Sequence, residues 1–472
     1  MLKIKEVIGG VKLPARASAW YLAASAVGKA AGVLVTPLFT RLLDRDEYGR
    51  FTLYMTLLGV ATVICSAASS GSAVYKGLKD YSKFQEGYLK GVLAVTLCFS
   101  TLICILLFAF SSFLSLRPIL LIPLSLQIFC DGITSVAITR ARFYYKYKSV
   151  SLISIINAIL PPILSVSMLY LFGGDYMIRI YALLFVSLIT AVISLLSLTR
   201  GKDQPDRRTV KYIVRSSLPL LPHTISSALS GQTDKFIITA IMGTAALAKY
   251  SVVYSMGIGM QFIVNAIGSA LSPWIIRRLA VGEEKRVTEL IMPMTLGYCA
   301  LSLCLIAISP DALLILAPKD YLDALDAIVP IALSIPFYFI SSVVAVGLIQ
   351  QSIGKYSVLL SCVSAVLSVT LNYMLIARYG YFGAGVATLA HQALSAILGI
   401  FLLNKASTKS VIPVFSFLLP CVASLGVGSL IYLLKDIPWA RCLIMLIPIG
   451  ALVYCMSVAK SLVIEKPDKA CA

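Results

Sequence analysis

The chain has 472 residues, of which 59% are hydrophobic and only 13% are charged. Soluble domains carry about a quarter charged residues, so this composition excludes an ordinary soluble protein. The formal charge of +19 would suit a nucleic-acid-binding protein, but the basic residues are confined to short segments between long apolar runs, which excludes nucleic acid as the partner.

The apolar runs have the length of membrane spans. A hydrocarbon core about 30 Å thick is crossed by about 20 helical residues. Runs of that length follow one another along the chain and predict an all-α polytopic membrane protein with about 14 transmembrane helices. In chain order the predicted spans are 18–41, 51–73, 91–111, 118–139, 149–171, 178–199, 216–243, 250–272, 290–309, 327–350, 356–377, 382–403, 411–434 and 439–460.

The loops between these spans differ in charge. With the N-terminus inside, the predicted cytoplasmic segments hold 28 of the 40 Lys and Arg residues and 10 of the 21 acids, a net charge of +18 against +1 outside. This is the positive-inside asymmetry, and it predicts a multi-pass protein with both termini in the cytoplasm. The partner expected for the basic loops is anionic membrane lipid.

The organisation predicted along the chain is two lobes of six spans and two further spans. The segment 200–215 is polar, basic and contains Pro205, as expected of a linker. Gly49–Leu53 after the first span resembles Ala248–Val252 after the seventh, and transporters built from such repeats bind substrate where the repeats meet. The predicted domains are a lobe at 1–200, a cytoplasmic linker at 201–215, a lobe at 216–403, and the last two spans with a cytoplasmic tail at 404–472.

Several motifs resemble one known family. The segments 350–355 and 379–388, with Asn372 between them, look like the region of spans ten to twelve in polysaccharide transporters. These are the oligosaccharide-lipid flippases of the multidrug/oligosaccharidyl-lipid/polysaccharide exporter superfamily. The outer hairpin Arg41–Gly49 is similar to the family's R-L-L-x-x-x-x-Y-G element, and Asp234-Lys235 matches a common acidic–basic pair. The resemblance implies two pseudo-symmetric six-helix lobes around a central cavity that opens alternately to each side.

The resemblance also implies a function. It predicts a flippase of the bacterial cytoplasmic (inner) membrane that moves a polyprenyl-pyrophosphate-linked glycan, an O-antigen or other surface polysaccharide repeat unit, to the outer leaflet. Other membrane proteins of polysaccharide assembly are further candidate partners. No catalytic residue, cofactor or metal is predicted. The sequence has no GxxxxGK[ST] loop, so an ion gradient or a concentration difference is expected to drive transport.

Charged residues inside spans are the first site candidates, because each costs about 2.5–3.5 kcal/mol at the bilayer centre. Lys29 and Lys235 are predicted to line the cavity and attract a pyrophosphate, since an ammonium suits phosphate oxygens. Static buried ion pairs are the alternative, and the depths of Lys29 and Asp131 would allow them to pair. For Asp131 both roles stay open: it lines the cavity, or it forms a static ion pair. Asp234 is a candidate counter-ion, proton carrier or cation ligand.

Uncharged polar residues in the spans complete the candidate set. His391, Asn157 and Asn265 are candidates to line the cavity, and His223 joins Asp234 as a candidate for coupling because histidine titrates near neutral pH. Hydrogen bonding between helices is the alternative role for each of them.

Other functions remain to be weighed. A cation-coupled drug exporter or a lipid II flippase of the same superfamily is the first alternative, although a drug exporter for cationic cargo would favour an acidic cavity. A membrane polymerase, ligase or glycosyltransferase is less favoured, because such enzymes need a sizeable outer loop. The largest outer loop, 310–326, carries Asp311, Asp320, Asp323 and Asp326, which are interpreted as a solvated surface.

Overall fold

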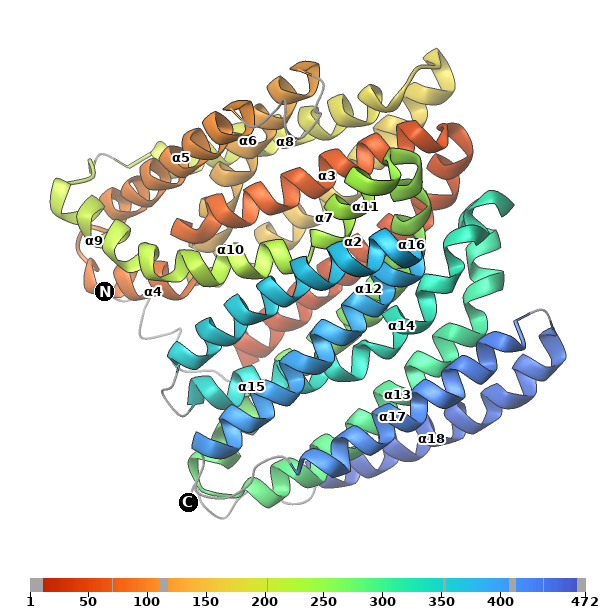
Figure 1. Ribbon diagram of the computed structural model, residues 1–472. Coiled ribbons are helices and arrows are strands. Elements are labelled where there is room, and N and C mark those ends of the chain that lie inside the picture. The colour runs from red at the N-terminus through yellow and green to blue at the C-terminus, as the bar shows by residue number, and fades with distance from the viewer. Residues whose placement is uncertain are drawn as a thin grey trace. The chain divides into compact units, whose positions relative to one another are not determined.

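The computed structural model confirms the predicted all-α class. It describes residues 12–69, 71–109, 118–201, 203–350, 354–406, 413–435 and 437–464. Within these ranges every regular element is helical and no strand occurs (Figure 1). The chain divides into two compact units, Met1–Gln232 and Thr233–Ala472. The predicted domain boundaries at 200, 215 and 403 stay predictions.

The first unit contains six long apolar helices. They correspond to the predicted spans one to six, although the helix of the second span, predicted at 51–73, is Arg45–Cys65. In this unit α6 packs against both α5 and α8, and α2 packs against α7. Its elements are α2 (Lys12–Leu42), α3 (Arg45–Cys65), η1 (Ser66–Ser69), α4 (Gly71–Asp80), α5 (Gln85–Ala109), α6 (Pro118–Phe143), α7 (Tyr147–Phe172), α8 (Tyr176–Thr199), α9 (Arg207–Ser217), η2 (Leu218–Leu220) and α10 (Leu221–Ser230).

The second unit begins in the middle of the predicted seventh span. In it, α13 packs against α17 and α18, and α12 packs against α15 (Figure 1). Its elements are α11 (Thr233–Met242), α12 (Thr244–Ala280), α13 (Glu284–Leu316), η3 (Lys319–Ala327), α14 (Ile328–Leu333), α15 (Ile335–Gln350), α16 (Gly354–Ala406), α17 (Val414–Leu433) and α18 (Pro438–Ile464).

Ten described helices are long and apolar enough to cross a membrane. About fourteen spans result when α16 is counted as two and when the interrupted seventh span and the shorter apolar parts of α17 and α18 are added. α16 combines the predicted spans eleven and twelve, which separate at Gly380. The backbone there has φ 56° and ψ −130°, a conformation that glycine adopts without strain. The tenth span is formed by α14 and α15, and the seventh by α10 and α11.

The seventh span differs from the continuous helix predicted at 216–243. α10 ends at Ser230 and α11 begins at Thr233, with a turn at Gly231 and Gln232 between them. Glycine has a low helix propensity, and serine side chains offer the backbone alternative hydrogen bonds, so a Ser-Gly-Gln sequence favours a break. The break places Asp234 in the first turn of a new helix.

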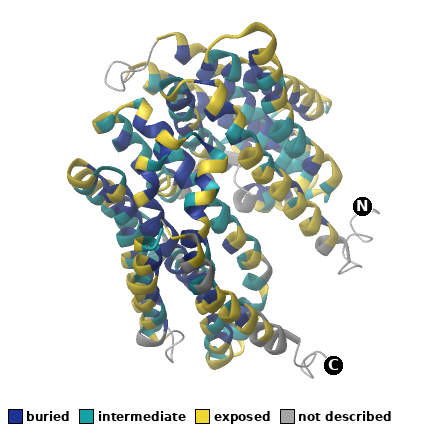
Figure 2. Cartoon of the chain, turned by 90° about the vertical axis from the view of Figure 1, so that its right-hand side faces the viewer, coloured by how far each residue is buried: buried dark blue, intermediate teal, exposed yellow. Residues whose placement is uncertain are grey.

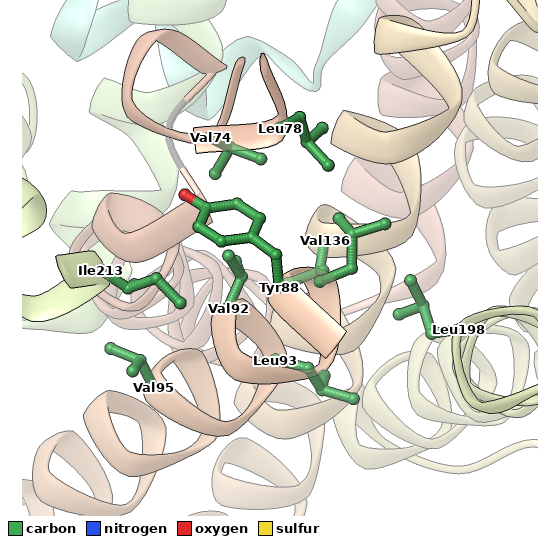
Figure 3. Close-up of a cluster of buried hydrophobic side chains, with 10 residues drawn as sticks. Val74, Leu78, Tyr88, Val92, Leu93, Val95, Val136, Leu198 and Ile213 are labelled. Atoms are coloured by element: carbon green, nitrogen blue, oxygen red, sulfur yellow. The ribbon is translucent and has the colours of Figure 1, made fainter. Parts of the chain in front are cut away.

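The predicted linker contains a helix. Thr209, Ile213 and Ser217 recur every four residues on α9 and are buried, and α9 packs against α5. The neighbouring basic residues of α9 are exposed: Arg207, Arg208, Lys211 and Arg215. Figure 3 shows Ile213 within an apolar cluster around Tyr88, with Val74 and Leu78 from α4 and Val92, Leu93 and Val95 from α5. The cluster anchors the amphipathic helix at one end of the first unit.

Exposure in both units follows the membrane pattern. Large apolar side chains are exposed, among them Leu34 at 74%, Tyr170 at 83% and Ile447 at 75%. Exposed residues, in yellow, recur along the helices in Figure 2. In water such surfaces would be unfavourable, whereas lipid tails solvate them.

Candidate functional site

The second unit holds a buried polar cluster around Asp234, which is 4% exposed. The hydroxyl of Tyr250 on α12 donates to Asp234 Oδ2 at 2.7 Å, and the backbone N–H of Lys235 donates to Oδ1 at 2.9 Å. Because Asp234 lies in the first turn of α11, the positive end of the helix dipole also favours its charge. The ionised carboxylate is therefore well stabilised here.

Lys235 extends the cluster towards a second tyrosine. Its Nζ lies 4.9 Å from the centroid of the Tyr254 ring, a cation–π contact. The rings of Tyr250 and Tyr254 are stacked with centroids 5.6 Å apart. An aromatic surface of this kind stabilises an ammonium within the cluster.

His391 belongs to the same cluster. It is 6% exposed on α16, with Nδ1 3.3 Å from the carbonyl oxygen of Ala387, and it is close enough to Asp234 for an electrostatic interaction. The structure thus brings together three of the predicted site residues, Asp234, Lys235 and His391.

Asn265 lies apart from this cluster. It is on α12, eleven residues after Tyr254, about 16 Å along the helix. Its Oδ1 accepts a hydrogen bond from the Tyr338 hydroxyl at 2.9 Å, and it lines a cavity of about 170 Å³ between α12 and α15. Ser269, Ser272 and Ser342 also line that cavity, which is otherwise apolar.

In the first unit a chain of hydrogen bonds joins Asp131 to Asn157. Gln127 Nε2 donates to Asp131 Oδ1 at 3.1 Å and to the Ser187 hydroxyl at 2.5 Å. The Thr190 hydroxyl is within hydrogen-bond distance of the backbone carbonyl oxygen of Ser187 and lies 3.3 Å from Asn157 Oδ1. The chain links α6, α8 and α7, and it connects two residues that the sequence treated separately.

Lys29 lies on α2 and is exposed. Its neighbour Gly28 faces α7, where a Cβ added to Gly28 would lie 3.3 Å from Ala158 Cβ, so Lys29 points away from that contact. Within the described ranges no ion pair joins Lys29 to Asp131. The pairing considered from their depths is therefore wrong, because a depth match does not fix which way a side chain points.

The structure also places His223, the second coupling candidate. His223 is half-buried on α10 and makes a contact of its own, and its coupling role stays a prediction. Among the described residues no group of three or more His, Cys, Asp or Glu side chains could hold a metal ion.

The acids of the segment 310–326 are solvated, as expected, and some of them also make contacts. Asp311 accepts two hydrogen bonds from the guanidinium of Arg441, and Asp323 pairs with Lys249. These carboxylates stay largely exposed while joining neighbouring elements of the second unit.

Sequence reasoning missed Arg179, which lies at the start of the predicted span 178–199 and was not selected as a site candidate. In the structure its guanidinium carbon lies 3.7 Å from the ring centroids of both Phe39 and Phe51 and 5.6 Å from that of Tyr48. The three rings flank or belong to the Arg41–Gly49 motif. The recurrence of aromatic residues around that motif could have indicated a cation-holding role.

The apolar helices define a multi-pass, all-helical membrane protein. The sequence model of the polysaccharide biosynthesis protein family matches residues 15–279, more than half of the chain. The chain belongs to this family. A search of curated proteins finds no match.

Solved structures share the fold at low sequence identity. A lipid II flippase MurJ in an inward closed conformation matches with a TM-score of 0.69 and 15% identity, over 93% of this chain and 99% of that one. An outward-facing multidrug resistance MATE transporter of the MOP superfamily matches with a TM-score of 0.58 and 15% identity, over 89% of this chain and 99% of that one. A MOP superfamily transporter from Pyrococcus furiosus matches with a TM-score of 0.58 and 15% identity, over 89% of this chain and 98% of that one.

Proposed function

We propose that this protein is a flippase that moves a polyprenyl-pyrophosphate-linked oligosaccharide across the bacterial cytoplasmic membrane by alternating access. In this proposal both termini are cytoplasmic, and the cargo is an O-antigen or other surface polysaccharide repeat unit. The family supports a role in polysaccharide biosynthesis, and the fold supports transport rather than chemistry on the cargo.

The observation that carries the proposal is the state of Lys29. It lies within a membrane span, it is exposed, and it forms no ion pair within the described part of the chain. An uncompensated ammonium in a span is costly unless it meets water or an anion. A pyrophosphate would supply the anion, since lysine is a compact point charge for phosphate oxygens.

Lys235 supplies a second lysine in a span, held against the Tyr254 ring. Two lysines favour anionic cargo over the cationic drugs of a drug exporter. The Pyrococcus furiosus transporter is described as having a binding pocket of reverse polarity that suggests a different function. Pocket charge is thus a reasonable guide to cargo within this fold.

The test is reconstitution of the full chain in liposomes that carry an undecaprenyl-pyrophosphate-linked oligosaccharide. Exposure of the sugar on the far leaflet is followed with a membrane-impermeant glycosidase. We expect Lys29→Ala and Lys235→Ala each to slow exposure at least about tenfold, since a charge-assisted contact contributes about 1.5–3 kcal/mol. Lys29→Arg should retain part of the rate.

Lys148→Ala is the matched control, because Lys148 is an exposed lysine at the start of α7 outside the proposed site. Normal transport by both lysine variants would reject the cationic site. Transport of lipid II in place of the oligosaccharide would move the protein to the lipid II flippases. Conversion of the glycan without translocation would make it an enzyme.

A further inference from the structure

Asp131 lies in the interior of α6, thirteen residues after the helix begins. It is half-buried, and within the described ranges no Lys, Arg or His forms an ion pair with it. An ionised carboxylate in that position has neither a counter-ion nor the positive end of a helix to stabilise it. Its neutral, protonated form has no such requirement.

The amide of Gln127 supports the same conclusion. Both N–H donors of its Nε2 have an acceptor, one Asp131 Oδ1 and the other the Ser187 hydroxyl. Its Oε1 is buried without a hydrogen-bond partner, although the residue is only 1% exposed. An orphaned buried acceptor costs about 1–3 kcal/mol. A donor is therefore missing beside an amide that already contacts a carboxyl group.

A protonated carboxyl group would be that donor. Carboxylic acids and primary amides can pair through two hydrogen bonds, one from the amide N–H to the acid carbonyl and one from the acid O–H to the amide oxygen. The first of these bonds is present at 3.1 Å between Gln127 and Asp131. The second would satisfy Oε1.

We propose that Asp131 and Gln127 form a proton-binding site in the first unit, in which the Asp131 carboxyl takes a proton from water and donates it in a hydrogen bond to Gln127 Oε1. Uptake forms one O–H bond and removes the carboxylate charge. Release breaks that bond, returns the proton to water and leaves Oε1 without a donor. No electron transfer or further reactant is involved.

Other titratable groups lie on the elements around this site. Tyr54 on α3 and Cys130 on α6 interact electrostatically with Asp131, and the Tyr54 hydroxyl is itself buried without a partner. Arg179 on α8 lies eight residues before Ser187, about 12 Å along the helix. The elements packed against α6 carry further titratable side chains, none of which forms an ion pair with Asp131 within the described ranges: Arg45, Asp46, Glu47, Tyr48, Arg50 and Cys65 on α3, Tyr75, Lys76, Lys79 and Asp80 on α4, Glu86, Tyr88, Lys90, Cys98 and Cys104 on α5, Tyr147, Lys148 and Tyr170 on α7, and Tyr176 and Tyr181 on α8, while η1 has none.

The site has a route to neighbouring helices. Ser187 accepts from Gln127, and Thr190, one turn further along α8, contacts Asn157 on α7. A change of charge at Asp131 therefore acts on the polar contacts that join α6, α8 and α7. If the proposed flippase function holds, this site would let proton binding bias the packing of the first unit during transport; proton binding itself does not depend on that function.

Infrared difference spectroscopy of the full chain in liposomes tests the site without a transport assay. Between neutral and strongly alkaline pH we expect loss of a C=O stretching band from a protonated carboxylic acid. The band should be missing in Asp131→Asn and unchanged in Asp203→Asn, the control at an exposed loop aspartate. In Gln127→Leu it should shift, because the acid loses its amide partner.

The outcomes separate the possibilities. A band that survives in Asp131→Asn, or no band in the wild type, overturns the proposal. A band that appears only when Na⁺ is withdrawn would make Asp131 a cation ligand and also overturn it. Should Asp131→Asn not fold, ¹³C-labelling of aspartate carboxyls with the Gln127→Leu variant decides the same question. A band that behaves as expected in a protein that moves no lipid-linked glycan would retain the site and reject the flippase.

Discussion

Asp131, which is half-buried, and Asp234, which is buried, are acids in apolar helices, and they differ in what surrounds them. Asp234 begins a helix, accepts from the Tyr250 hydroxyl and the Lys235 N–H, and has a lysine as its neighbour. Asp131 is in mid-helix, accepts from Gln127, and leaves that amide half satisfied. Position within a helix thus stabilises the charge of one acid and leaves the other better suited to a proton.

The physical cause is the set of backbone N–H groups at a helix start, which have no partners within the helix. The break after Ser230 creates such a start next to Asp234, whereas the unbroken α6 offers none to Asp131. Variants that remove charge while retaining shape can test this contrast directly.

The largest difference in the free energy of unfolding is expected between Asp234→Asn and Asp131→Asn. Asp234→Asn should lower the free energy of unfolding by about 2 kcal/mol, because charge-assisted hydrogen bonds are lost. Asp131→Asn should cost less than about 1 kcal/mol, because an amide resembles a neutral acid in shape and polarity. Unfolding in detergent measures both, and the reverse order would contradict the contrast.

A smaller difference is expected at the tyrosines beside these acids. Tyr250→Phe should cost about 1.5 kcal/mol, since it removes a hydroxyl that donates to a buried carboxylate. Tyr54→Phe should be neutral or stabilise by up to about 1 kcal/mol, because its hydroxyl is buried without a partner. The pair of variants differs only in the partner of the hydroxyl, so equal effects would remove the basis of the comparison.

The smallest effect is expected where a tyrosine and an aspartate meet at the surface. The Tyr212 hydroxyl donates to Asp80 Oδ2 at 2.8 Å in an exposed contact, so Tyr212→Phe should cost no more than about 0.5 kcal/mol. It serves as the water-exposed counterpart of Tyr250→Phe.

This contact also has a pH dependence. Burial, followed by the hydrogen bond to Asp80 and its charge, raises the pKa of Tyr212 from 10.0 to about 12. The unfolded chain loses the phenol proton first, so the Tyr212 contribution to stability should fall between about pH 10 and pH 12 and be constant below. Unfolding of wild type and Tyr212→Phe across that range measures it; a difference that grows with pH would contradict the sign.

Parts of the site were accessible to sequence reasoning. Asp234, Lys235 and His391 were all selected because polar groups in apolar spans need a reason, and the structure brings them into one cluster. Arg179 was not selected, because its aromatic partners come from α2 and α3, more than a hundred residues earlier. The Lys29–Asp131 pairing was wrong because helical rise predicts depth, whereas rotation about the helix axis decides direction.

The sequence by itself determined that this is a helical membrane protein, where its spans lie, and which residues are costly enough to need an explanation. These follow from the length of the apolar runs and from the free-energy cost of a charged side chain in the hydrocarbon core, and both are local properties of the sequence. Only the tertiary structure decided that one acid has a tyrosine and a helix start while the other has a half-satisfied amide. Such partners come from distant segments, and packing alone selects them.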